Sequence, residues 1–138
     1  MIDPRRILLA DDDHDLRVGV ADLLASLGLQ VLQAETGLEA VRIAQKRHVD
    51  AALLDLHMPD CTGLDAIPLL RPARVGLPCI VYSGALTAEL ERAATTAGAF
   101  AVLHKPVDPG LLRSEVLRAL SDGGPHRSTP PADGSAPR

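Results

Sequence analysis

The sequence predicts an α/β domain in which helices cover both faces of a five-stranded parallel sheet. Short apolar runs alternate with amphipathic stretches five times between residues 7 and 121. The connections between them are short, as in chains built from strand–helix units. The apolar runs lack an alternating polar face, which is typical of strands buried on both sides. A doubly wound sheet of order 2-1-3-4-5 places the first and third strands side by side at its centre.

The first two strand–helix units follow from apolar spacing and from end signals. Residues 7–10 form the first strand, and the next helix begins at Asp13 or His14 and stops at Gly28. The apolar residues of this helix have the spacing of a buried face: Leu16, Val20, Leu23 or Leu24, and Leu27. Residues 29–34 are more mixed in polarity and form a strand nearer an edge.

Thr36 is the expected N-cap of the second helix. Glu39 follows three residues later, and the two residues match the pattern of a capping box, in which each side chain accepts from the other's backbone N–H. The buried side of this helix is expected to carry Leu38 or Ala40, Val41 and Ala44.

The remaining units continue the same alternation. Residues 50–55 form the third strand, and a loop over residues 56–62 leads to a helix that starts near Gly63. Pro68 and Pro72 interrupt this helix, so we expect it to be short or bent. The last elements are a strand at 78–83, a helix from Thr87 to about Thr96 that Gly98 ends, a strand at 100–104 and a helix from about 108 to 121.

The composition changes at Asp122. Beyond it the sequence is rich in glycine, proline and serine, and no apolar residue larger than proline remains. Such a segment buries too little surface to offset the entropy of ordering it. We therefore expect one domain at residues 1–121 and a disordered tail at residues 122–138.

The composition also argues against several classes of protein. The formal net charge is −4, and nucleic-acid binding by a domain requires a basic surface. The two cysteines, Cys61 and Cys79, form no CxxC motif or Cys/His cluster, which argues against zinc. No apolar run approaches a membrane span or a secretory signal. We expect a cytoplasmic protein with reduced thiols.

Acidic residues stand where two of the predicted strands end. Asp11 and Asp12 follow the first strand, and Asp55 ends the third. Ligand sites of open α/β sheets form beyond the carboxyl ends of the strands. Carboxylate oxygens there suit Mg²⁺, which binds one or two carboxylates together with water and phosphate.

Two more polar residues end strands at the same edge. Ser83 ends the fourth strand, and Lys105 follows the fifth and precedes Pro106. Phosphoryl transfer uses such a set: a metal ion and a lysine neutralise the oxygens of the transferring group, and a carboxylate can be the nucleophile.

These motifs together resemble the receiver domain of bacterial two-component response regulators, which has the flavodoxin-like fold of the chemotaxis regulator. The resemblance covers about residues 5 to 121. It rests on Leu-Leu-Ala-Asp-Asp-Asp ending at Asp13, on Leu-Leu-Asp-Leu-His-Met-Pro-Asp-x-x-Gly-Leu beginning at Leu53, on Ser83 and on Lys105-Pro106. Each motif is weak alone, and their order and spacing make the set specific.

The resemblance implies a role for each matching position. It makes Asp55 the phosphoacceptor, Asp12 a direct ligand of Mg²⁺ or Mn²⁺, Asp11 a ligand through water, His57 a ligand through its backbone carbonyl, Ser83 and Lys105 the partners of the phosphoryl group, and Pro106 the residue after a cis peptide bond. Phosphorylation of Asp55 by a histidine kinase or a phosphotransfer protein would shift the face formed by the fourth helix, the fifth strand and the fifth helix. A downstream protein, unknown from the sequence, would read that change.

Three positions depart from the family pattern. The family usually has Tyr or Phe three residues before the lysine and often Phe two residues after it, where this chain has Val102 and Val107. Ala85 stands where many relatives have a polar side chain. Val102 is the switch position in the family, and it is too small and stiff to act as a moving ring. We expect the loop at residues 84–86 to carry the switch instead.

A Mg²⁺-dependent phosphohydrolase is the alternative function. Phosphatases of the dehalogenase type also form an aspartyl phosphate. They need a second Asp two residues after the nucleophile, where this chain has His57, and a cap domain, for which it has no room. We therefore interpret the chain as a switch that phosphorylates and dephosphorylates itself, and not as an enzyme. Ending without an effector domain, it is expected to be a stand-alone or excised receiver.

Other polar residues near this edge have simpler interpretations. Asp13 is expected to cap the first helix, and Asp60 to be a turn residue. The imidazole of His57 is not expected to bind the metal, because Mg²⁺ prefers oxygen ligands. Cys61 is interpreted as a plain loop thiol, since nothing in its sequence surroundings lowers its pKa.

Overall fold

The computed structural model describes residues 4–122 of the chain. Five parallel strands pair in the order β2-β1-β3-β4-β5, as predicted. The strands are β1 (Arg6–Ala10), β2 (Gln30–Ala34), β3 (Ala51–Asp55), β4 (Cys79–Ser83) and β5 (Ala101–His104). The helices are α1 (His14–Ala25), α2 (Gly37–Lys46), α3 (Gly63–Leu70), α4 (Ala88–Ala97) and α5 (Pro109–Asp122).

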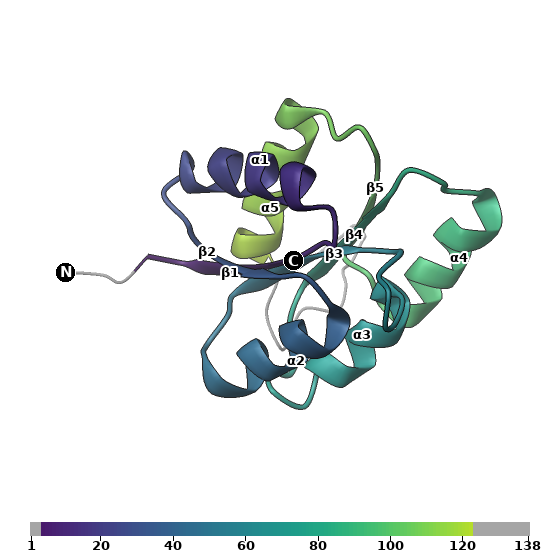
Figure 1. The fold of residues 1–138 in the computed structure, drawn as a ribbon, viewed down its shortest axis with the longest axis horizontal. Helices are drawn as coiled ribbons and strands as arrows, with labels where there is room; N and C mark the ends of the chain where they lie inside the picture. Colours follow the sequence, from purple (N-terminus) through teal and green to yellow (C-terminus); the bar gives the residue numbers. More distant parts are fainter. Residues whose placement is uncertain (1–3, 123–138) are drawn as a thin grey trace, which may run out of the picture.

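The sheet lies between two layers of helices. In Figure 1, α1 and α5 cover one face of the sheet, and α2, α3 and α4 cover the other. The two central strands, β1 and β3, are adjacent, and Leu8 pairs in register with Ala52. The carboxyl ends of all five strands therefore meet at one edge.

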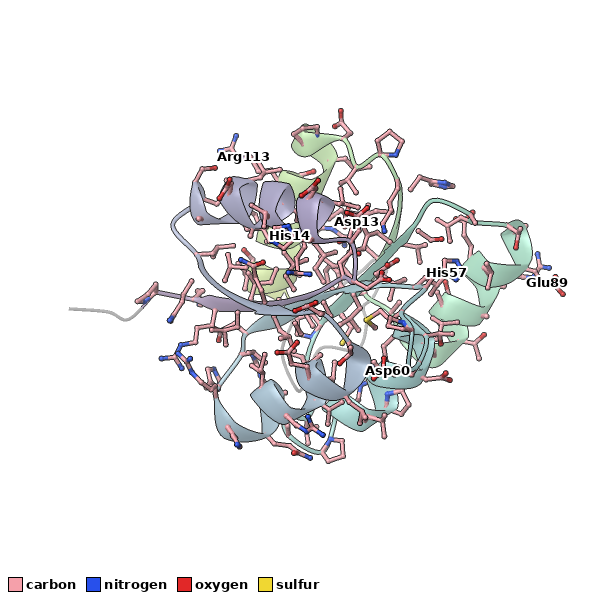
Figure 2. All side chains as sticks on the ribbon, viewed as in Figure 1. Asp13, His14, His57, Asp60, Glu89 and Arg113 are labelled. Atoms are coloured by element: carbon pink, nitrogen blue, oxygen red, sulfur yellow. The ribbon has the colours of Figure 1, made fainter. Side chains whose placement is uncertain are left out.

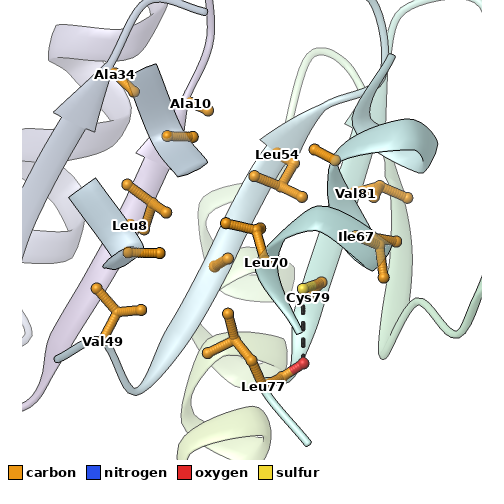
Figure 3. Close-up of a cluster of buried hydrophobic side chains, with 14 of the residues drawn as sticks. Leu8, Ala10, Ala34, Val49, Leu54, Ile67, Leu70, Leu77, Cys79 and Val81 are labelled. Carbon is orange, nitrogen blue, oxygen red and sulfur yellow. Dashed lines mark hydrogen bonds between the residues drawn. The ribbon is translucent and has the colours of Figure 1, made fainter. Parts of the chain in front are cut away.

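Side chains alternate between the two helical layers along every strand. Leu8, Leu54 and Val81 belong to the core cluster beneath α2, α3 and α4 (Figure 3). Leu9, Leu53 and Tyr82 belong to the cluster on the other side of the sheet. All four residues of β1 from Ile7 to Ala10 are fully buried, which explains why the sequence of this strand shows no polar alternation.

Each of the first four helices begins directly after a polar N-cap residue, and Asp13, Thr36 and Thr87 were predicted at three of these positions. The side chains of Asp13, Thr36, Thr62 and Thr87 accept hydrogen bonds from the backbone N–H groups three residues further along. The predicted capping box at Thr36 is wrong in one half: Glu39 accepts from the N–H of Glu35 at 2.7 Å. Thr62 and Asp65 form the complete box instead.

The two helices nearest the first strands bury partly different faces from those predicted. On α1, Leu24 is the buried leucine of the pair, and Arg17 is buried as well. On α2, Ala40 and Ala44 are buried as expected, but the Leu38 side chain is 54% exposed. Of the two residues expected as alternatives at this point of the buried side, Ala40 is therefore the buried one.

The third helix is short, as its prolines predict, and the fifth ends close to the predicted start of the tail. Pro68 lies inside α3, and Pro72 lies beyond its end. α5 extends to Asp122, one residue into the segment predicted as a tail. The rest of that tail, residues 123–138, lies outside the described residues. Within residues 4–122, none of the helices has the length and apolar content that crossing a bilayer requires.

The start of α2 is tied to the loop after β3. The Asp60 carboxylate accepts from the backbone N–H groups of Gly37 at 2.9 Å and Leu38 at 2.8 Å. These two donors lie in the first turn of α2, where the helix itself offers no acceptor. A Cβ atom at Gly37 would overlap the sulfur of Cys61, so the close approach requires glycine. Asp60 is thus a tertiary helix cap, and its interpretation as a turn residue was incomplete.

Leu8→Ala should lower the free energy of unfolding by about 2–5 kcal/mol, because it leaves a cavity between β1 and the helices below it. Urea unfolding followed by circular dichroism measures the change. Leu38→Ala is the matched control and should change stability by less than about 0.5 kcal/mol, since that side chain is largely exposed. Equal losses in the two variants would contradict the assignment of the core.

Asp60→Ala should destabilise the fold by at most about 1 kcal/mol at neutral pH, because the carboxylate is exposed and competes with water for its hydrogen bonds. The N–H groups of Leu38 and Gly37 hold the pKa of Asp60 below its ordinary value of 3.8. A lowered pKa stabilises the fold above the ordinary pKa, and this contribution is lost as the pH falls through the folded value.

The difference between wild type and Asp60→Ala should therefore be full at neutral pH and narrow as the pH falls below the ordinary pKa of 3.8. Urea unfolding at a series of pH values measures it. A difference that grows on acidification would contradict the capping role.

Candidate functional site

Three strands bring charged side chains together at the carboxyl edge of the sheet. Asp11 follows β1, Asp55 ends β3, and Lys105 follows β5. Each of the three stands two residues after a side chain that faces α1 and α5, so strand alternation assigns all three to that face of the sheet. Asp12 extends the group, and one carboxylate oxygen from each of the three aspartates lies within 4.8 Å of the other two.

The Lys105 ammonium lies between two of these carboxylates. Its Nζ is 3.3 Å from Oδ2 of Asp11 and 3.2 Å from Oδ1 of Asp55. Asp11 is fully buried and Asp55 is 3% exposed. Buried carboxylates require paired charges or hydrogen bonds. Lys105 thus compensates part of the negative charge that the fold concentrates here.

Asp11 is held by a hydrogen bond on each carboxylate oxygen. Its Oδ1 accepts from the backbone N–H of Asp13 at 2.9 Å. Its Oδ2 accepts from the Tyr82 hydroxyl at 2.5 Å. The buried guanidinium of Arg17 donates to the Asp11 backbone carbonyl at 2.8 Å and to Gln33 at 3.0 Å.

Sequence reasoning missed both Tyr82 and Arg17. Arg17 lies on the buried side of α1, where the spacing of the sequence predicts only apolar residues. Tyr82 precedes Ser83, and strand alternation assigns it to the face that Asp11 and Asp55 share. The signal that could have found it is composition, because Tyr82 is the one tyrosine of the chain.

Burial raises the pKa of Asp55 above its ordinary value, and the neighbouring charge of Asp11 acts in the same direction. The backbone N–H of His57, which donates to Oδ1 of Asp55 at 3.2 Å, and the Lys105 ammonium both oppose this shift. Oδ1 of Asp55 thus carries both stabilising contacts. A carboxylate in this setting has a partly desolvated charge, which favours bonding to an electrophile or a metal ion.

Asp12 and His57 lie at the exposed rim of the site. Figure 2 shows the His57 side chain on the side of the molecule where α4 lies, and Asp13 and His14 at the start of α1. The His57 backbone contacts Asp55 through its N–H, as described above. The structure thus places all four predicted metal-binding residues around the same strand ends.

Ser83 and Val102 lie on the other face of the sheet. Ser83 is fully buried, and its hydroxyl oxygen accepts from the backbone N–H of Ala85 at 3.0 Å. Val102 is partly buried against the core cluster beneath α2, α3 and α4, as are Leu86 and Leu90. The hydroxyl therefore holds the start of the β4–α4 loop. The predicted cis peptide bond between Lys105 and Pro106 is present.

The loop cysteine has no feature of a reactive thiol. Partial burial raises the pKa of Cys61 above its ordinary value, and the carboxylates of Asp60 and Asp65 add to this effect. Reactive cysteines have lowered pKa values. The interpretation of Cys61 as a plain loop thiol agrees with this setting.

The donor atoms of the site fit a hard divalent cation. The three aspartates offer oxygen ligands at one open edge, and Asp12 is exposed enough to reach solvent. Mg²⁺ prefers oxygen ligands and retains several waters. The mutual repulsion of three carboxylates would also be relieved by a cation. Asp11, Asp12 and Asp55 are thus the residues that would hold one.

Comparisons with known proteins show which family the chain belongs to. Residues 7–117 match the family model described as the response regulator receiver domain. The transcriptional regulatory protein GlrR of Escherichia coli K12 is 32% identical over 122 residues, covering 88% of this chain and 28% of that protein. The CAI-1 autoinducer sensor kinase/phosphatase CqsS of Vibrio cholerae is 32% identical over 115 residues, covering 81% of this chain and 17% of that protein.

Solved structures show the same fold. The CheY-like receiver domain protein of Methanospirillum hungatei has a TM-score of 0.81 at 28% sequence identity, over 86% of this chain and 95% of that one. This chain spans less than a third of the length of the two curated relatives named above. The family match covers nearly all of the described fold and includes every strand that carries a site residue. The chain belongs to the response regulator receiver domain family of two-component signal transduction.

Proposed function

We propose that Asp55 is the phosphoryl acceptor of this receiver domain and that Mg²⁺ or Mn²⁺ is its cofactor. The observation that carries the proposal is the convergence of Asp11, Asp55 and Lys105 from three strands onto one site. Asp11 and Asp55 both contact Lys105, and Asp55 is the one that stands at the phosphoacceptor position of the family pattern. The phosphoryl donor is a histidine kinase or a histidine phosphotransfer protein.

The transfer forms a bond between a carboxylate oxygen of Asp55 and phosphorus. The phosphorus–nitrogen bond of the donor phosphohistidine breaks, and its electron pair returns to the donor imidazole. A divalent cation held by Asp11, Asp12 and Asp55 would neutralise charge on the phosphoryl oxygens. Lys105 contacts Oδ1 of Asp55 before transfer, so a small movement of its flexible side chain brings the ammonium onto a phosphoryl oxygen.

Ser83 connects the site with the α4 side of the molecule. Its hydroxyl binds the Ala85 N–H, and turning toward a phosphoryl oxygen would break that hydrogen bond. The start of the β4–α4 loop would then be released, and α4 with it. This route needs no aromatic ring at position 102, where Val102 packs against the core cluster on that side. The output surface is the α4-β5-α5 face.

The role that this site supports is that of a signalling switch and not of a turnover enzyme. The residue two positions after Asp55 is His57, so the general acid of the dehalogenase-type phosphatases is missing at that position. The phosphoryl group would be removed by hydrolysis at Asp55 itself. We place the switch in the cytoplasm, where its free thiols stay reduced.

The partners follow from the chemistry of the transfer and from the relatives. A sensor kinase and a transcriptional regulator each contain a segment similar to this chain. We propose that this chain receives its phosphoryl group from a kinase of that class and passes the signal to another protein. Its net charge of −4 supports a protein target and not direct binding to nucleic acid or a membrane.

Asp55→Asn should abolish phosphorylation by acetyl phosphate in the presence of Mg²⁺, because an amide is a poor nucleophile of nearly the same shape. Intact-mass measurement detects the added phosphoryl group. Asp22→Asn is the matched control, since Asp22 is an exposed carboxylate on α1, and it should be labelled like the wild type. Undiminished labelling of Asp55→Asn would refute the acceptor, and steady turnover of a small phosphomonoester would favour the phosphatase.

Mg²⁺ should raise the melting temperature by about 3–8 °C at a concentration roughly ten times its dissociation constant. Asp12→Ala should remove most of this rise, because it deletes the exposed ligand while leaving the buried pair with Lys105 intact. The same variant should melt at or above the wild-type temperature without metal, since one repelling charge is gone. A full Mg²⁺ response in Asp12→Ala would show that the cation binds elsewhere.

A further inference from the structure

Tyr82 is a buried polar residue at the site with no part in the transfer described above. Its side chain is fully buried near the carboxyl end of β4, in the core cluster that faces α1 and α5. Its hydroxyl donates to Oδ2 of Asp11, and its ring lies 4.7 Å from the Lys105 Nζ. One side chain thus contacts both an acidic residue and the single lysine of the site.

The partners of Asp11 are divided unequally between its two carboxylate oxygens. A carboxylate oxygen accepts two hydrogen bonds. Oδ2 of Asp11 has the Tyr82 hydroxyl and the Lys105 ammonium as neighbours, while Oδ1 has the N–H of Asp13. Of these groups, the Asp13 N–H and the Tyr82 hydroxyl are held in place by the backbone and by core packing. They leave the second position of Oδ1 for a cation or its water.

We propose that Tyr82 is a positioning residue of the acidic site: its hydroxyl orients the Asp11 carboxylate for a divalent cation, and its ring holds the Lys105 ammonium between the carboxylates. The inference rests on the proposed metal role of Asp11. Groups that hydrogen-bond metal ligands commonly fix their orientation, and their loss weakens metal binding about 10- to 100-fold.

Tyr82 would also keep the Asp11 carboxylate hydrogen-bonded when the Lys105 ammonium moves away from it. When the ammonium turns from Asp11 toward a phosphoryl group on Asp55, the buried carboxylate of Asp11 loses one partner. The Tyr82 hydroxyl remains on Oδ2, so the carboxylate is not left unsatisfied inside the protein. The face of the ring, whose centroid is 4.7 Å from the Lys105 Nζ, also favours a cation beside it.

A purely structural role would need only the ring. Phenylalanine would fill the same space among the residues that face α1 and α5, and it would keep an aromatic surface beside Lys105. The hydroxyl is therefore the group to test, and Tyr82→Phe removes it while keeping the volume of the core. The same substitution isolates orientation of Asp11 from packing.

The experiment measures Mn²⁺ binding to the unphosphorylated protein, using the electron paramagnetic resonance signal of the free ion. Tyr82→Phe should weaken Mn²⁺ binding about tenfold. Ile80→Val is the matched control, because Ile80 is fully buried on the same strand and the same face and has no polar atom. It should lower the melting temperature without metal and leave the Mn²⁺ affinity within about twofold of wild type.

The outcomes separate this inference from the proposed function. A loss of about threefold or more in Tyr82→Phe, with Ile80→Val unchanged, supports the positioning role. Wild-type affinity in Tyr82→Phe, or an equal loss in both variants, overturns it while the metal site itself stands. Failure of the wild type to bind Mn²⁺ would overturn the metal site and this inference together.

Discussion

Two buried carboxylates that share one ammonium group are the interaction on which the architecture of this site depends. The Lys105 ammonium lies between the buried carboxylates of Asp11 and Asp55 and offsets part of the cost of burying them, because isolated buried charges are costly. The three residues come from β1, β3 and β5, with β4 between the last two strands. The ion pairs of Lys105 with Asp11 and Asp55 can therefore form only when the strands pair in this order, and these ion pairs in turn favour that order.

Strand alternation divides the site between the two layers of the molecule. By strand alternation, Asp11, Asp55 and Lys105 belong to the face of the sheet that α1 and α5 cover. Ser83 belongs to the opposite face, which α2, α3 and α4 cover. A single event at the edge can thus act on both layers. The hydroxyl of Ser83 holds the N–H of Ala85, so the β4–α4 loop is the part of the second layer most directly linked to the charges.

Most of the fold could be predicted because its signals are local. Apolar runs located the strands, and the caps at Asp13, Thr36 and Thr87 located helix starts. The contacts that escaped prediction join residues far apart in sequence. Tyr82 meets Asp11 across 71 residues, and Asp60 caps a helix 23 residues earlier. Such contacts depend on strand register and loop path, which a local pattern does not contain.

The position of Tyr82 gives the domain an optical property. The chain has no tryptophan and one tyrosine, and that tyrosine is buried against Asp11 and Lys105. Near-ultraviolet absorbance and circular dichroism of the folded protein therefore arise almost entirely from one phenol inside the site. Phenol spectra respond to hydrogen bonding and to nearby charge. The unlabelled protein thus carries its own chromophore inside the acidic site, and no dye or engineered fluorophore is needed to observe changes there.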